Sequence, residues 1–135
     1  MESIELSTIF DPQMFAIIGV SLLWGITNPF IARGTKSATR PPPDTAIWLR
    51  PLLELHCFVS NWRFALPFVL NQLASLLFMA LVVNLPLTFT VVSVNSLTFL
   101  ITAITGVYIG EGKLSAHTIV GCILVLVGVI ITTIF

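Results

Sequence analysis

Residues 64–110 read FALPFVLNQLASLLFMALVVNLPLTFTVVSVNSLTFLITAITGVYIG, and none of these residues is charged. A membrane-spanning helix needs about 20 apolar residues, so this stretch is too long for one crossing and long enough for two. Asn84-Leu85-Pro86 interrupts it near the middle, because Pro86 has no N–H to continue a helix and suits the first turn of a new one. The stretch therefore predicts two membrane-spanning helices, at 64–83 and 86–109, joined by a turn at 84–85.

Two further uncharged stretches lie on either side of this region. Residues 12–32 separate Asp11 from Arg33, and after Lys113 only His117 is ionisable. Each stretch is long enough for one crossing. The N-terminal sequence MESIELSTIFD has three acidic residues and no base, whereas a signal peptide begins with positive charge, so we expect the first helix to be retained. The expected fold is an all-α polytopic membrane protein with four transmembrane helices. Its expected parts outside 64–109 are a tail at 1–12, a helix at 13–33, a loop at 34–63, a turn at 110–114 and a helix at 115–135.

The composition of the whole chain is typical of a membrane protein. The chain is 56% hydrophobic and 9% charged, whereas soluble domains carry roughly 25% charged residues. Its net charge is zero, which argues against nucleic acid as a partner. Cys57 and Cys122 make no disulfide framework and have no metal-ligand spacing. With no nucleophile–base pair and no cluster of metal ligands in or near the spans, we expect neither catalysis nor a cofactor nor a bound metal.

The distribution of bases predicts the orientation in the membrane. Six bases lie in or beside the 34–63 loop and the 110–114 turn, namely Arg33, Lys36, Arg40, Arg50, Arg63 and Lys113. The opposite side has none, and cytoplasmic loops carry the excess of bases. The loop should therefore be cytoplasmic, with both termini non-cytoplasmic. Spans near 20 residues fit the endoplasmic reticulum or the plasma membrane, since length sorts proteins between membranes only weakly.

The second half of the 34–63 loop predicts an amphipathic helix at about 46–62. Five apolar residues recur at the spacing of one helical face: Trp48, Leu52, Leu55, Val59 and Trp62. A Trp near each end suits a helix lying in the cytoplasmic interface of the membrane. The alternative is that this apolar stripe packs onto the helical bundle or onto a partner.

Neutral polar residues recur inside the predicted spans, where no Asp, Glu, Lys, Arg or His occupies a central position. The candidate polar cluster comprises Ser21, Trp24 and Asn28 in the first span, Asn71, Gln72 and Ser75 in the second, and Asn95, Thr98 and Thr102 in the third. Such residues either bridge helices by hydrogen bonds or line a cavity for a polar ligand or headgroup. We favour bridging, and expect Ser and Thr to bond their own i−4 carbonyls. Pro29 should bend the first span near Trp24, as a gate or merely for packing.

Small residues mark faces on which helices can approach closely. Gly106 and Gly110 form a GxxxG pair at the end of the third span, and Gly121 and Gly128 lie seven residues apart in the fourth. Both spacings are typical of helix–helix contact in membranes.

With these residues identified, the chain resembles the transmembrane protein 234 family. The resemblance rests on SLLWGITNPFIARGTK (21–36), PFVLNQLASLLF (67–78), VVSVNSLTFLITAITG (91–106) and YIGEGKLSAHTIVGCILVLVGVIIT (108–132). It implies a place in the drug/metabolite transporter superfamily and a four-helix bundle like that of small multidrug resistance transporters. Those transporters use a membrane-embedded glutamate in their first helix, where this chain has the uncharged run 22–25, LLWG. They also pair two copies, and GCILVLVGV (121–129) resembles their dimerisation helix.

Two functions remain open at this point. The first is an accessory or scaffold subunit of a larger membrane assembly, in contact with lipids and with other membrane subunits. The second is a small transporter or flippase for a neutral or lipid-like substrate, acting as a parallel homodimer without proton coupling. The absence of ionisable groups at membrane depth favours the first.

Overall fold

The computed structural model describes residues 12–134, and every regular element in this range is a helix. The elements are α1 (Pro12–Ser37), α2 (Arg50–Ser60), α3 (Trp62–Asn84), α4 (Leu87–Tyr108) and α5 (Ala116–Ile134). The all-α prediction is confirmed for these residues. The tail at 1–12 falls almost entirely outside the described residues.

Three of the helices are long and apolar enough to cross a membrane, namely α1, α3 and α4. Their 26, 23 and 22 residues correspond to about 33–39 Å at 1.5 Å per residue, against a hydrocarbon core of about 30 Å. The apolar stretch Ala116–Thr132 of α5 is shorter. The structure thus has three long candidate spans and one shorter apolar helix.

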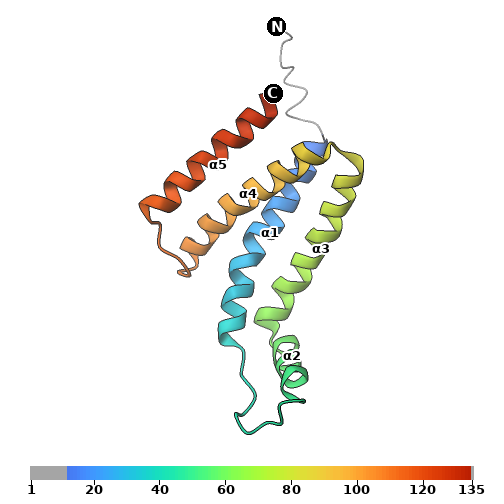
Figure 1. The fold of residues 1–135 in the computed structure, drawn as a ribbon, viewed down its shortest axis with the longest axis vertical. Helices are drawn as coiled ribbons and strands as arrows, with labels where there is room; N and C mark the ends of the chain where they lie inside the picture. Colours follow the sequence, from blue (N-terminus) through green and yellow to red (C-terminus); the bar gives the residue numbers. More distant parts are fainter. Residues whose placement is uncertain (1–11, 135) are drawn as a thin grey trace.

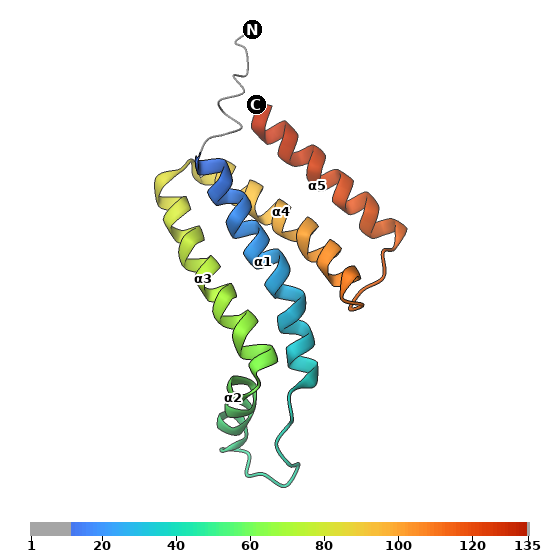
Figure 2. The same cartoon turned by 180° about the vertical axis from the view of Figure 1, so that it is seen from behind.

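The helix α1 lies between α3 and α4 and packs along both (Figures 1 and 2). The helix α5 packs on the far side of α4, and α2 lies beside the N-terminal end of α3. The loop that carries α2 lies at the end of the molecule opposite the first turn of α1, whereas the loop between α4 and α5 lies beside the last turns of α1 (Figure 1). The central position of α1 makes its two faces the main packing surfaces of the bundle.

The interior of the bundle mixes apolar and small polar residues, and its outside is apolar. Among the described residues, four hydrophobic residues are buried (Ile17, Val20, Ala74 and Val94) and so are five polar ones (Ser21, Thr27, Thr90, Ser93 and Thr98). Large apolar side chains such as Leu76 and Phe99 are each 67% exposed. Exposed large apolar side chains occur along all five helices, whereas soluble monomers rarely expose large contiguous apolar patches, so this surface is suited to hydrocarbon.

The turn between α3 and α4 forms at the predicted break. α3 ends at Asn84, whose side-chain amide donates to the Ala80 carbonyl at 2.7 Å. Pro86 caps α4 rather than joining its first turn, and its carbonyl accepts the Thr90 N–H at 3.0 Å.

The amphipathic helix is shorter than the predicted 46–62. It begins at Arg50, with a Pro in its first turn, and ends at Ser60. Asn61 then has an extended backbone and caps α3, because its side chain accepts the Arg63 N–H at 3.2 Å. α3 therefore begins at Trp62, two residues before the predicted start at 64. Trp62 therefore belongs to α3, and the prediction of one continuous helix through residue 62 is wrong.

The apolar stripe of this segment points away from the rest of the molecule. Its members Trp48, Leu52, Leu55 and Val59 are 86%, 64%, 60% and 63% exposed. The contact between α2 and α3 is made instead by Phe58, whose ring centroid lies 5.2 Å from that of Phe64. The alternative in which the stripe packs onto the bundle is therefore wrong.

Candidate functional site

Asn71 is the hub of a hydrogen-bond network between α1 and α3. Its side-chain amide donates to the Thr27 hydroxyl and to the Asn28 side-chain oxygen, each at 2.9 Å. Its backbone carbonyl accepts from the Trp24 indole N–H and from the Ser75 hydroxyl, each at 3.2 Å. We call these five residues the Asn71 network. It holds α1 and α3 in register, since hydrogen bonds between helices persist in hydrocarbon.

Aromatic packing supports the network. The Trp24 ring lies against that of Phe78 on α3, with centroids 5.0 Å apart. α1 runs through Pro29 as a helix, and Pro29 is buried. The bend expected there stays a prediction.

The other predicted polar residues do not join this network. Asn95 donates to the Val91 carbonyl of its own helix at 2.9 Å, so the expectation that it bridges helices is wrong. Gln72 is exposed on α3. Ser21 is buried, and its hydroxyl reaches the carbonyls of Ile17 at 2.7 Å and, on α4, of Val94 at 3.3 Å. Four of the nine cluster residues belong to the Asn71 network, namely Trp24, Asn28, Asn71 and Ser75.

Three hydroxyls of α4 are buried without a hydrogen-bond partner among the described residues: Ser93, Thr98 and Thr102. Thr90, by contrast, donates to its i−4 carbonyl at 2.9 Å. Thr98 and Thr102 were expected to donate to the carbonyls four residues before them in α4, and that expectation is wrong. A buried hydroxyl without a partner costs about 1–3 kcal/mol.

Two close helix–helix contacts lie at glycines that the sequence patterns did not predict. A Cβ at Gly25 would lie 2.5 Å from the Ile101 Cβ, and one at Gly34 would lie 2.5 Å from the Arg63 carbonyl oxygen. The spacing of glycines alone did not reveal them, because neither forms a GxxxG pair.

The glycines that were predicted to pack lie in open space. A Cβ at Gly106, Gly110, Gly121 or Gly128 would meet nothing within 4 Å. Gly110 has φ +78° and lies beyond the last residue of α4, where it ends the helix. It cannot share a helical face with Gly106, so that predicted pair is wrong.

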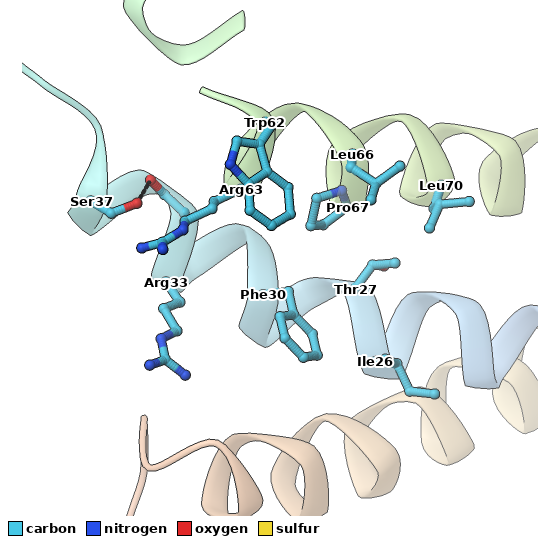
Figure 3. A pocket seen from close by; sticks show the side chains of 11 residues that line it. Ile26, Thr27, Phe30, Arg33, Ser37, Trp62, Arg63, Leu66, Pro67 and Leu70 are labelled. Carbon is cyan, nitrogen blue, oxygen red and sulfur yellow. Dashed lines mark hydrogen bonds between the residues drawn. The ribbon is translucent and has the colours of Figure 1, made fainter. Parts of the chain in front are cut away.

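A groove of about 510 Å³ lies between α1 and α3, towards the end that carries the basic residues (Figure 3). It is lined by Ile26, Thr27, Phe30, Arg33, Gly34, Ser37, Trp62, Arg63, Leu66, Pro67 and Leu70. We call it the α1–α3 groove. Sequence analysis missed it. The available signal was the position of Arg33 and Arg63 at facing ends of two predicted spans.

The basic residues near the groove differ in their partners. Lys36 pairs with Glu111, and Arg50 lies 3.9 Å from Glu54. Arg33 donates to the Ile109 backbone carbonyl at 3.5 Å. Arg63 lies over the Trp62 ring, 5.9 Å from its centroid. Within residues 12–134 neither arginine forms an ion pair with a carboxylate.

No group of three or more His, Cys, Asp or Glu side chains comes together in the described part of the chain. Cys57 and Cys122 are both free thiols.

Long apolar helices and an extensive apolar exterior define a helical membrane protein. Residues 17–133 match the family described as "Putative transmembrane family 234". The chain belongs to that family.

Two curated relatives agree with this assignment. A "Transmembrane protein 234 homolog" from Anopheles gambiae is 35% identical over 121 residues, covering 87% of this chain and 84% of that protein. A second protein of that description, from Dictyostelium discoideum, is 31% identical over 122 residues, covering 88% and 92%. No solved structure matches the chain.

Proposed function

We infer that this protein is a non-catalytic accessory or scaffold subunit of a larger membrane assembly. In this proposal α5 is a fourth span, both termini are non-cytoplasmic, and α2 lies in the cytoplasmic interface of the endoplasmic reticulum or plasma membrane. The 19 residues of α5 correspond to about 28 Å, which nearly matches a hydrocarbon core of about 30 Å. The exposed stripe on α2 suits that interface.

The open glycine face of α5 carries the proposal. Gly121 and Gly128 are exposed, and a Cβ at either would meet nothing within 4 Å. Apolar side chains gain little from leaving lipid for protein, so helices in membranes associate where small residues let backbones approach closely. This face is therefore suited to a partner helix.

The polar residues between α1 and α3 support a structural role over coupled transport. The amide of Asn71 has both donors engaged by side chains of α1. No Asp, Glu, Lys, Arg or His lies in the centre of a predicted span, and proton- or ion-driven transporters place such groups at membrane depth.

A small transporter or flippase of the drug/metabolite type, acting as a parallel dimer, is the second candidate. The specific observation in its favour is the set of three buried hydroxyls without partners, Ser93, Thr98 and Thr102. A neutral or lipid-like substrate that accepts hydrogen bonds would satisfy them.

The composition of the purified protein tests the proposal. The tagged full chain is extracted from its native membrane in mild detergent, and its mass and its co-purifying subunits are measured. A defined hetero-complex supports the accessory subunit, whereas a stable homodimer alone supports the transporter and contradicts the proposal.

Variants of α5 assign the contact to its glycine face. Gly121→Leu and Gly128→Leu should insert normally, because Leu favours hydrocarbon, yet lose the co-purifying partner. Val129→Leu, on another face of the helix, is the matched control. Retention of the same assembly by all three variants would contradict a role for this face.

A further inference from the structure

We propose that the α1–α3 groove binds one anionic phospholipid. The phosphate would lie between Arg33 and Arg63, and an acyl chain would follow the apolar wall towards Ile26 and Leu70. The chemical class follows from the order of polar and apolar groups along the groove. The proposal goes beyond the accessory role and does not depend on it.

The shape of the groove suits a ligand that stays partly in the bilayer. Its wall is apolar over most of its length, and Phe30, Leu66 and Leu70 are 39%, 56% and 39% exposed. Small-molecule sites usually bury most of their ligand's surface, whereas an acyl chain in this open groove would keep one side in hydrocarbon. The volume of about 510 Å³ accommodates part of one lipid molecule.

Charge is concentrated at one end. Figure 3 shows Arg33 and Arg63 at the same end of the groove, with Ile26 and Leu70 at the other. One arginine comes from the last turns of α1 and the other from the first turn of α3. Arg33 has engaged one N–H with a backbone carbonyl, and Arg63 lies beside an indole ring. Their remaining donors are available to a phosphate, which guanidinium groups bind with paired hydrogen bonds.

No carboxylate neutralises either arginine of the groove. Lys36 and Arg50 each have a carboxylate within ion-pair distance, whereas Arg33 and Arg63, like Arg40 and Lys113 outside the groove, have none among the described residues. Two unneutralised cations at one site repel each other, and an anion between them relieves that repulsion. A zwitterionic headgroup would bring its own cation and relieve it less.

The spacing along the helices matches an amphiphile. Arg33 lies seven residues from Ile26 on α1, and Arg63 lies seven residues from Leu70 on α3. Seven helical residues correspond to a rise of about 10 Å. On both α1 and α3, therefore, the apolar residue lies about 10 Å deeper along the groove than the arginine. Trp62, which is 69% exposed, lies at the charged end, where aromatic residues mark the boundary between headgroups and hydrocarbon.

Two contacts fix the spacing of α1 and α3 at the two ends of the groove. At the charged end Gly34 brings α1 against the backbone at Arg63, and Asn61 donates to the Gly34 carbonyl at 3.3 Å. At the deep end the Asn71 amide is bonded to Thr27. Since both ends are fixed before a ligand arrives, binding costs little reorganisation.

Lipid binding to the full chain, purified in a neutral detergent, tests the proposal. Native mass spectrometry and the change in Trp fluorescence are measured during titration with phosphatidic acid and, separately, phosphatidylcholine. We expect phosphatidic acid to bind at least about tenfold more tightly, which is equivalent to about 1.4 kcal/mol. Equal affinity for the two lipids would overturn the proposal.

Variants assign the preference to the two arginines. The double variant Arg33→Gln/Arg63→Gln should reduce it to about threefold or less, whereas the matched control Arg40→Gln/Lys113→Gln removes the same charge outside the groove and should retain it. The variant Arg33→Lys/Arg63→Lys keeps the charge for insertion but loses paired hydrogen bonding, and should also weaken the preference. If a groove variant that folds keeps the full preference for phosphatidic acid over phosphatidylcholine, the assignment of that preference to Arg33 and Arg63 is wrong.

A competition experiment separates a lipid site from a phosphate site. Glycerol phosphate has the anionic group without the acyl chains, so millimolar concentrations should not displace phosphatidic acid. Full displacement would mean that the site binds phosphate alone, and the lipid proposal would fail.

Discussion

Adding one methyl group at Gly34 should destabilise the bundle. The new Cβ of Gly34→Ala would lie 2.5 Å from the Arg63 carbonyl oxygen and 2.8 Å from its carbon. These are backbone atoms of α3, so no side-chain rotation removes the overlap. Pro67 has no N–H to donate to that carbonyl, so the Arg63 oxygen lacks the usual donor four residues on.

The magnitude follows from two opposing terms. Overpacking of a tight contact costs about 1–3 kcal/mol, and backbone on both sides places this site at the upper end. Replacing Gly by Ala inside a helix returns about 0.5–1 kcal/mol. We expect a net loss of about 2 kcal/mol in the free energy of unfolding. Gly106→Ala in α4, where a Cβ meets nothing within 4 Å, should gain about 0.5–1 kcal/mol.

The assay is denaturant unfolding of both variants in mixed micelles, followed by Trp fluorescence. The result that supports the geometry is a difference of about 2–3 kcal/mol between Gly34→Ala and Gly106→Ala, with opposite signs relative to the natural sequence. Equal effects of the two substitutions would refute the close approach of α1 to α3.

Three further predictions concern the network, the ion pair and the topology. Asn71→Leu should lower the free energy of unfolding by about 1–2 kcal/mol, because two hydrogen bonds between helices are lost at about 0.6 kcal/mol or more each. The control Gln72→Leu, at an exposed position, should change it by less than about 0.5 kcal/mol. Equal losses in the same unfolding assay would contradict the network. Lys36→Gln removes the ion pair with Glu111 and should lower the free energy of unfolding by less than about 1 kcal/mol, with a smaller loss at higher salt concentration. A larger loss would show that the pair contributes more than an exposed ion pair does. A tag at either terminus should be inaccessible to antibody after selective permeabilisation of the plasma membrane, because all six bases lie on the other side; staining at that stage would reverse the orientation.

The positions of the long helices could be predicted from uncharged stretches and Pro86, although α1 continues past Arg33 to Ser37 and α3 begins before Arg63. The uncharged residues 64–110 and the break at Pro86 correspond to α3 and α4. The amphipathic helix was predicted too long at both ends. A Pro in its first turn and the extended backbone of Asn61 bound it at Arg50 and Ser60, and the periodicity of apolar residues carries no information about such local breaks.

The polar site could be predicted only in part. A run of uncharged residues shows which side chains are polar but not which of them face a neighbouring helix. Asn71 does, Gln72 faces outward, and Asn95 bonds its own helix. The same limit applies to glycines, because a Gly matters where a neighbour approaches, and the approach to Gly34 depends on the start of α3, 29 residues away in the sequence.

Each of two opposite faces of α1 nonetheless carries, in its sequence, the residues that pack against one neighbouring helix. Gly25 and Gly34 are nine residues apart, which is about half a turn beyond two full turns, so they lie on opposite faces of α1. Ser21 lies one turn before Gly25 and reaches α4, and Thr27 lies two turns before Gly34 and accepts from α3. Each face thus combines one small residue, which permits close approach, with one hydroxyl, which bonds across the interface. Because the two faces serve different neighbours, α1 can be held tightly by α4 while its other face, together with α3, forms the groove that carries Arg33 and Arg63.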